Sequence, residues 1–95
     1  MHMEKENKKY YSDREKKLME LEYEIIQDFV KTRKNQKMTQ AKLAQEANLL
    51  RETIARIENL MTSPKLNTLI KLLEPMGYTL KIVKLDKEDE SDKKI

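Results

Sequence analysis

Residues 39–59, TQAKLAQEANLLRETIARIEN, constrain the fold of this chain more than any other stretch. Ala44 is small at a place where one helix must let the next approach closely, and Asn48 follows four residues later. Asn is, after Gly, the residue that best tolerates the positive φ of a tight turn. Six residues further, β-branched Ile54 is placed to pack the second helix back on the first. The spacing therefore predicts two short helices joined by one tight turn.

A longer helix is expected before this two-helix unit. From residue 13 to about residue 34, apolar side chains recur at helical spacing, which predicts one long helix or two abutting helices. Ser12 or Asp13 can cap the first turn. Ile26 and Phe29 are expected to face the core of the two-helix unit, so that this segment and the unit fold together.

The start of each helix in the unit is predicted from its capping residue. Thr39 is placed to cap the first helix, with Met38 and Leu43 on either side of it as a hydrophobic staple. The second helix is expected from about Leu50 to Leu60. Because Leu50 has no side-chain oxygen, it offers no N-cap, and the first turn of that helix is not defined by the sequence.

A further helix is expected after the unit. Asn67 or Thr68 opens it, and it should end around Pro75 and Gly77. Pro75 lacks the amide that a helix interior requires, and Gly77 suits a left-handed terminus. The inner side of this helix is expected to carry Leu66, Leu69, Ile70, Leu72, Leu73 and Met76.

Residues 78–85, YTLKIVKL, are predicted to form one strand because apolar and polar side chains alternate there. A lone strand in a helical domain leaves its hydrogen-bonding edge unpaired, and the simplest partner is the same strand of a second copy. We therefore predict a homodimer joined by an antiparallel ribbon that involves Leu80, Ile82 and Val83. The alternative is an extended tail packed on the core.

Positive charge is concentrated around the two-helix unit. Residues 31–65 contain eight Lys and Arg side chains against three Glu, so this segment carries a net charge of +5 in a chain of +3. A basic segment of this kind suits a polyanionic partner such as DNA. Charged stretches are also common on solvated faces, so charge alone does not distinguish a DNA-binding surface from an ordinary solvent-exposed one.

Several classes of function lack the residues that they require. The chain has no cysteine, one glycine and one histidine, His2, at its terminus. The chain therefore lacks the residues that thiolate chemistry, a glycine-rich phosphate loop and the usual zinc sites require. We expect no catalytic site, metal or cofactor, and no enzyme activity. No apolar run spans a bilayer and the N-terminus lacks a signal peptide, so we expect a cytoplasmic protein that binds no membrane.

The chain resembles the phage-repressor (Xre, or Cro-like) helix-turn-helix family in a series of motifs: TQ, LA, TI and RIEN within residues 39–59, then SP-L-TL. The resemblance covers about half of the chain. It implies an all-α, lambda-repressor-like domain whose second helix reads double-stranded DNA. Leu50 and Leu60 depart from the pattern, because the family usually has a polar residue and Gly there.

Base contacts are expected from the second helix, whose exposed N-terminal part reaches base edges in a helix-turn-helix. Arg51 and Arg56 can each offer a bidentate fork to guanine, and Thr53 can contact a thymine methyl. Glu52 can accept from a cytosine amine or orient Arg56, four residues away. The alternative for Glu52 and Arg56 is a surface ion pair on a solvated helix.

Other side chains are expected to hold phosphates rather than read bases. Gln40 lies at a helix start, where backbone amides add their dipole, and the resemblance implies DNA contacts for Gln40 and Asn59. Glu58 is expected to have an internal role, paired with Arg33 or Arg56. In a twofold dimer the reading helices enter successive major grooves about 34 Å apart, so the operator should be an inverted repeat. The remaining phosphate contacts are expected at Thr39, Lys42 and Lys65.

The order of elements, with a helix before the motif and a helix and short strand after it, resembles the HigA-type antitoxins of bacterial type II toxin-antitoxin modules. In that family the N-terminal segment commonly contacts the toxin, a small ribosome-dependent mRNA endonuclease of the HigB type, while the helix-turn-helix represses the operon. The resemblance implies a small basic toxin as a partner of this chain. It also implies a toxin-facing surface of Tyr10, Tyr11, Leu18, Met19, Leu21 and Tyr23.

Two other functions stay open at this point. One is a stand-alone repressor whose N-terminal helix only stabilises the dimer. The other is an adaptor that no longer binds DNA, which the departures at Leu50 and Leu60 favour and the basic excess opposes. The toxin-facing surface has an alternative of its own, in which Leu18, Leu21 and Ile25 only extend the protein's core. The predicted organisation is a flexible N-terminal segment at 1–12, a DNA-binding domain with helical extension and dimerisation strand at 13–85, and a flexible charged tail at 86–95.

Overall fold

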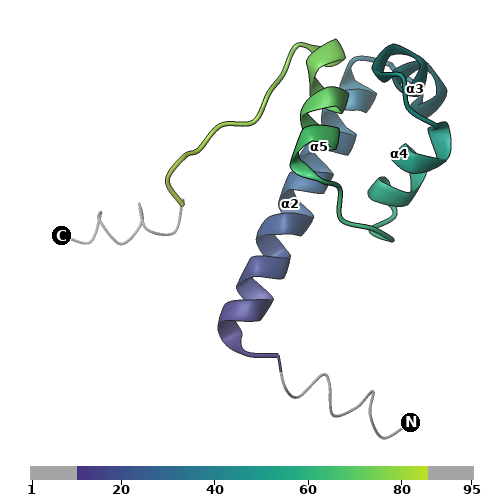
Figure 1. Cartoon of the computed structure of the whole chain (residues 1–95). Coiled ribbons are helices and arrows are strands. Elements are labelled where there is room, and N and C mark those ends of the chain that lie inside the picture. The colour runs from purple at the N-terminus through teal and green to yellow at the C-terminus, as the bar shows by residue number, and fades with distance from the viewer. Residues whose placement is uncertain (1–10, 86–95) are drawn as a thin grey trace, which may run out of the picture.

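The computed structural model of the protein describes residues 11–85. One long helix, α2, runs through the molecule, and α3, α4 and α5 gather around its C-terminal half while its N-terminal half extends away from them (Figure 1). The regular elements of the described residues are all helices, and residues 11–85 contain no strand. The elements are α2 (Asp13–Asn35), α3 (Gln40–Ala47), α4 (Arg51–Glu58), α5 (Leu66–Leu73) and a 3-10 turn, η1 (Glu74–Met76).

α2 begins with a reciprocal cap. The Ser12 hydroxyl accepts a hydrogen bond from the Glu15 amide at 3.0 Å, and the Glu15 carboxylate accepts one from the Ser12 amide at 3.0 Å. This capping box satisfies two amides at once, and it makes Ser12 rather than Asp13 the N-cap. The sequence left open one helix or two, and the structure has a single helix that ends at Asn35.

The two-helix unit predicted from the sequence is formed by α3, α4 and the turn between them. Thr39 accepts a hydrogen bond from the Lys42 amide at 3.0 Å and caps α3 as predicted. Met38, directly before this cap, is half-buried against the core. Asn48 ends α3 with φ 58° and ψ 47°, the left-handed conformation that the sequence predicts there. Leu50 precedes α4 and makes no side-chain cap, also as predicted.

The core lies where the four helices meet. Ile26 and Phe29 of α2 are each 2% exposed, which confirms that they face the two-helix unit. Leu43, Ile54 and Leu72, from α3, α4 and α5, are completely buried against them. The core is completed by Ala44, Ala47, Ile57, Leu69, Leu73 and Met76.

α5 begins earlier than the sequence predicts, and fewer of its residues face the core. Lys65 is its N-cap and Leu66 its first residue, so neither Asn67 nor Thr68 opens it. Leu66 and Ile70, expected on the inner side, are 66% and 39% exposed. They lie four residues apart and therefore share one strip of the helix, beside the stripe that packs on the core.

The end of α5 follows the prediction. α5 ends at Leu73, and η1, which contains Pro75, leads to Gly77 with a left-handed φ of 88°. The Gln36 side-chain amide donates to the Met76 carbonyl oxygen at 2.9 Å. This hydrogen bond ties the end of α2 to η1 and closes the domain on that side.

Residues 78–85 continue from η1 without helix or strand (Figure 1). Leu80 packs half-buried against the core, whereas Ile82 and Val83 are 101% and 78% exposed. The predicted strand is thus not formed within residues 11–85, because a strand requires a hydrogen-bonded neighbour. Pairing with a second copy stays a prediction. Residues 1–10 of the predicted N-terminal segment, Tyr10 included, and the predicted tail at 86–95 lie outside the described residues.

Candidate nucleic-acid interface and partner groove

α4 has one buried and one exposed face. Ile54 and Ile57 are 0% and 1% exposed and hold the helix against the core. Because the helix is fixed in this way, its other side is presented to solvent. That side carries the four base-reading residues expected from the sequence, with Arg51, Glu52 and Arg56 exposed and Thr53 half-buried.

Glu52 and Arg56 lie four residues apart on this face. Within residues 11–85, Arg33 pairs with Glu58 and Lys42 pairs with Glu46, and no ion pair joins Glu52 to Arg56. The surface pair considered from the sequence is therefore not present. The guanidinium group of Arg56 and the carboxylate of Glu52 are both accessible to a ligand.

A buried ion pair fixes the end of α4 on α2. Arg33 donates from Nε and Nη2 to the two carboxylate oxygens of Glu58 at 2.7 and 2.8 Å, and from Nη1 to the Met38 carbonyl oxygen at 2.9 Å. The two charged side chains are only 9% and 8% exposed. Bidentate geometry and the further hydrogen bond compensate the loss of water around the charges. Of the two partners expected for Glu58, Arg33 is confirmed and Arg56 is wrong.

Gln40, the first residue of α3, joins this ion pair. Its Nε2 donates to Glu58 Oε1 at 2.9 Å, so a carboxylate of the chain itself orients the amide expected to bind phosphate. A primary amide has two N–H donors, and Glu58 takes one of them. This contact was not predicted from the sequence. Gln40 begins α3 and Glu58 ends α4, so the two residues lie at opposite ends of the two-helix unit in the sequence.

The other residues expected to hold phosphates lie on the surface. Lys42 pairs with Glu46 at 3.4 Å, but both side chains are largely exposed, so water weakens the pair and Lys42 can exchange it for a phosphate. Thr39 is exposed as well, and its hydroxyl retains a proton to donate while its oxygen caps α3. Asn59 and Lys65 are exposed at the end of α4 and the start of α5.

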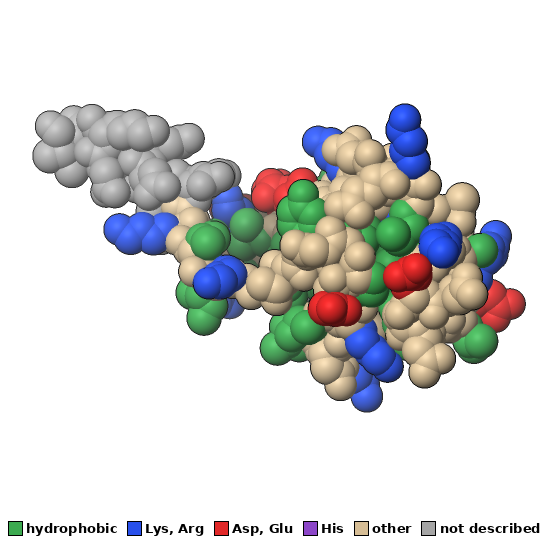
Figure 2. Space-filling model, turned by 90° about the horizontal axis from the view of Figure 1, so that it is seen from above, with side chains coloured by type: hydrophobic (Ala, Val, Ile, Leu, Met, Phe, Trp, Pro, Cys, Tyr) green, Lys and Arg blue, Asp and Glu red, His purple; other side chains and the backbone are tan. Residues whose placement is uncertain are grey.

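On the face shown in Figure 2, the charged side chains do not form one uniform basic surface. In the view of Figure 2, Lys and Arg side chains stand around the rim, and acidic side chains lie between them. The cations on this face thus stand apart from one another. Separate cations match individual phosphates, each of which adds a salt-dependent contact.

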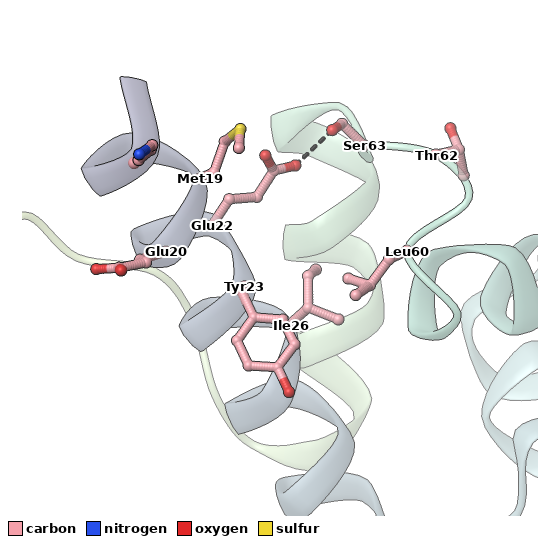
Figure 3. Close-up of a pocket in the computed structure, with 9 residues that line it drawn as sticks. Met19, Glu20, Glu22, Tyr23, Ile26, Leu60, Thr62 and Ser63 are labelled. Atoms are coloured by element: carbon pink, nitrogen blue, oxygen red, sulfur yellow. Dashed lines mark hydrogen bonds between the residues drawn. The ribbon is translucent and has the colours of Figure 1, made fainter. Parts of the chain in front are cut away.

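A groove of about 650 Å³ lies between α2 and the loop that joins α4 to α5 (Figure 3). Met19, Tyr23 and Ile26 line it from α2, and Leu60 faces them from the loop. The floor at Ile26 belongs to the core, whereas Met19 and Tyr23 are 46% and 49% exposed. The groove therefore offers an apolar surface that the described chain does not cover.

Two features define the loop wall of this groove. The Ser63 hydroxyl donates to the Glu22 carboxylate and joins the loop to α2 (Figure 3). Leu60 has a left-handed φ of 61°, which costs a residue with a Cβ about 1 to 2 kcal/mol and which Gly adopts freely. The Leu60 side chain is 52% exposed, so its burial offsets only part of this cost.

The toxin-facing surface expected from the sequence is brought together in part. Met19 and Tyr23 line the groove, whereas Tyr11, Leu18 and Leu21 do not. Leu18 and Ile25 are exposed, and Leu21 is half-buried outside the core cluster, so the alternative in which these three residues extend the core is wrong. The loop side of the groove was missed, because contacts between segments some forty residues apart leave no local pattern in the sequence.

The region around the groove has the opposite charge to the two-helix unit. Residues 13–28 contain six acidic and three basic side chains, a net charge of −3, against +5 for residues 31–65. Glu20 and Glu22 stand among the residues that line the groove, and Lys16 is its one cationic lining residue. A surface of this charge attracts a basic partner and repels phosphates.

Residues 30–83, more than half of the chain, match the helix-turn-helix family, and the protein belongs to this family. An uncharacterized HTH-type transcriptional regulator of Haemophilus influenzae is 35% identical over 75 residues, which cover 79% of this chain and 76% of that protein. Among solved structures, a toxin-antitoxin module from Streptococcus pneumoniae is similar with a TM-score of 0.63 and 28% identity, covering 87% of this chain and 91% of that one.

The matched region contains α3, the turn at Asn48 and α4. The family is one of DNA-binding transcriptional regulators and not of enzymes. Within residues 11–85, no helix has the length and apolar composition that crossing a membrane requires.

Proposed function

We propose that this protein is an antitoxin that represses its own operon and neutralises a small basic toxin of the HigB endoribonuclease type. Membership of the helix-turn-helix family supports the first activity, and similarity to a toxin-antitoxin module supports the second. The observation that carries the proposal is the presence of two separate exposed surfaces. One is the outer face of α4 in a basic region, and the other is the apolar groove beside the acidic part of α2.

Operator recognition is assigned to α4. The buried isoleucines of this helix hold it so that Arg51 and Arg56 are exposed on its outer face. In a major groove each guanidinium can donate to O6 and N7 of a guanine, while Thr53 contacts a thymine methyl. Glu52, which forms no ion pair with Arg56, accepts from a cytosine amine.

Phosphate contacts hold α4 in register with the bases. Glu58 orients the Gln40 amide, which leaves the second N–H of that amide for a phosphate oxygen. Arg33 fixes Glu58 in turn, so Arg33 and Glu58 act as positioning residues and Gln40 is the ligand. The remaining phosphate contacts are assigned to Thr39, Lys42, Asn59 and Lys65.

A dimer reads the operator in this proposal. Ile82 and Val83 are exposed apolar residues next to the half-buried Leu80, and pairing of residues 78–85 with a second copy would cover them. Two α4 helices related by this ribbon match an inverted repeat. Ile82→Pro removes one amide from the ribbon. Analytical ultracentrifugation should then give the mass of one chain instead of two, and an unchanged mass contradicts the ribbon.

Toxin binding is assigned to the N-terminal half of α2. Large apolar and aromatic side chains that a chain leaves exposed are typical anchors of a protein interface. The net negative charge of residues 13–28 favours association with a basic ribonuclease. The proposed surface consists of Tyr11, Leu18, Met19, Leu21 and Tyr23, together with Tyr10, which lies outside the described residues.

The test uses the short reading frame expected beside the gene of this protein. Expression of that product alone in bacterial cells should stop growth, and co-expression of the full chain should restore it. The duplex upstream of the operon should bind the full chain more tightly than an unrelated duplex, with an affinity that falls steeply with salt. Growth arrest that the chain does not relieve contradicts the toxin partner, and equal affinity for both duplexes contradicts the repressor.

A stand-alone repressor is the second candidate, and the similarity to an HTH-type transcriptional regulator supports it. In that case the upstream duplex binds in the same way, but no neighbouring product stops growth. The two candidates therefore differ in the growth experiment and agree in the DNA experiment.

A further inference from the structure

The groove between α2 and the α4–α5 loop has properties that DNA reading does not require. Its loop wall is Leu60, a half-exposed leucine held at φ 61° where Gly fits without strain. Its helix wall contains Met19 and Tyr23, which are also half-exposed. Met19, Tyr23 and Leu60, from two segments of the chain, thus line one space that the described chain leaves open (Figure 3).

The charge around the groove limits what can fill it. Glu20 and Glu22 are among its lining residues, and residues 13–28 carry a net charge of −3. A nucleic acid is repelled by this charge, whereas a basic protein is attracted to it. The apolar walls require an apolar side chain of that protein, because burial of apolar surface supplies most of the free energy of such contacts.

We infer that this groove receives an apolar anchor side chain of a basic partner protein, and that Leu60 is kept at a strained position because it forms one wall of the site. The inference rests on the proposed function, in which the toxin is that partner. It adds the loop after α4 to a surface otherwise assigned only to α2. The partner then contacts both the exposed half of α2 and the loop between α4 and α5.

Leu60→Gly is the most informative variant for this inference. The substitution removes the loop wall and also relieves the left-handed strain, so the midpoint of urea unfolding should stay at or above that of the wild type. Affinity for the product of the neighbouring reading frame, measured with both full-length proteins by isothermal titration calorimetry, should fall about tenfold. A loss of binding without a loss of stability separates the site from the fold.

A pair of matched substitutions on α2 tests the opposite wall. Met19 and Ile25 lie on the same helix and are both 46% exposed, but only Met19 lines the groove. Met19→Lys places a positive charge where the basic partner docks and should lower its affinity at least tenfold. Ile25→Lys, with the same change of charge, should bind within about twofold of the wild type.

Each result decides the inference. Loss of partner affinity in Leu60→Gly and Met19→Lys, with Ile25→Lys unaffected, supports it. Wild-type affinity in both groove variants overturns the inference that the groove is a binding site and leaves the proposed function intact. No binding by the wild-type chain overturns the proposed function together with the groove. A sedimentation mass altered by Leu60→Gly identifies a second copy as the occupant and also overturns the inference.

Discussion

The two halves of α2 have the same backbone conformation and different surroundings. In the C-terminal half, Ile26, Phe29 and Arg33 are 2%, 2% and 7% exposed. In the N-terminal half, no residue from 13 to 25 is buried. The difference arises from the neighbours, because α3, α4 and α5 surround only the C-terminal half (Figure 1). One continuous helix therefore serves as scaffold over part of its length and as exposed surface over the rest.

The two halves are also stabilised by different interactions. The C-terminal half is held by core packing and by the buried pair of Arg33 with Glu58. The N-terminal half depends on the capping box of Ser12 and Glu15 and on the contact of Glu22 with Ser63. Exposed helices gain little from tertiary packing, so local capping contributes a larger share of their stability. Substitutions in the two halves should therefore have different consequences.

The largest effect on stability is expected at the buried ion pair. Glu58→Ala leaves the Arg33 guanidinium buried without its carboxylate, which should lower the free energy of unfolding by about 3 to 5 kcal/mol in urea denaturation. Glu46→Ala is the control, because its pair with Lys42 is exposed and is expected to contribute roughly 0.3 to 0.5 kcal/mol. Equal losses in the two variants would show that the buried pair does not hold α2 to α4.

Neighbouring isoleucines test the boundary between the halves. Ile26 is 2% exposed and Ile25 is 46% exposed. Ile26→Ala opens a cavity in the core and should cost roughly 2 to 5 kcal/mol, measured by thermal or urea unfolding. Ile25→Ala should change stability by less than about 1 kcal/mol. Similar losses would mean that the exposed side of α2 is packed in the native protein.

A smaller change in DNA affinity is expected from a base-reading residue of the two-helix unit. Arg51→Ala removes one fork from the face of α4 and should weaken binding to the upstream duplex by roughly 1 to 3 kcal/mol, with relaxed preference at one base pair. Fluorescence anisotropy on a set of single-base variants of the duplex measures both quantities. Unchanged affinity would remove Arg51 from the reading residues.

The smallest change is expected for a phosphate contact. Lys42→Ala should weaken binding to all duplexes alike and lower the slope of log affinity against log salt by about one. The measurement is a salt titration on the upstream duplex and on an unrelated duplex. A loss confined to the upstream duplex would reassign Lys42 from phosphate contact to base reading.

The features predicted correctly from the sequence are local ones. The cap at Thr39 and the left-handed turn at Asn48 each depend on one residue type in one backbone conformation, so the sequence specifies them directly. Ile26 and Phe29 were placed in the core by helical spacing, and they are buried. The family pattern then located the exposed face of α4.

The features that were not predicted from the sequence depend on which segments pack against each other in the fold. Spacing alone did not choose between Arg33 and Arg56 as the partner of Glu58, because the choice is made by the packing of α2 on α4. Helical spacing also placed Leu66 on the inner side of α5, although no neighbouring helix reaches it. The groove at Leu60 has the same origin, since its two walls come from segments distant in the chain.

The central claim is that one chain carries two separate binding surfaces. The most direct test measures the binding of each variant to the ligand assigned to the other surface. Arg51→Ala is titrated with the partner protein, and Met19→Lys is titrated with the upstream duplex, each against the wild type under the same conditions. Both variants should bind like the wild type, because each substitution lies on the surface that the other ligand does not use. A tenfold loss in either titration would contradict the separation of the two surfaces.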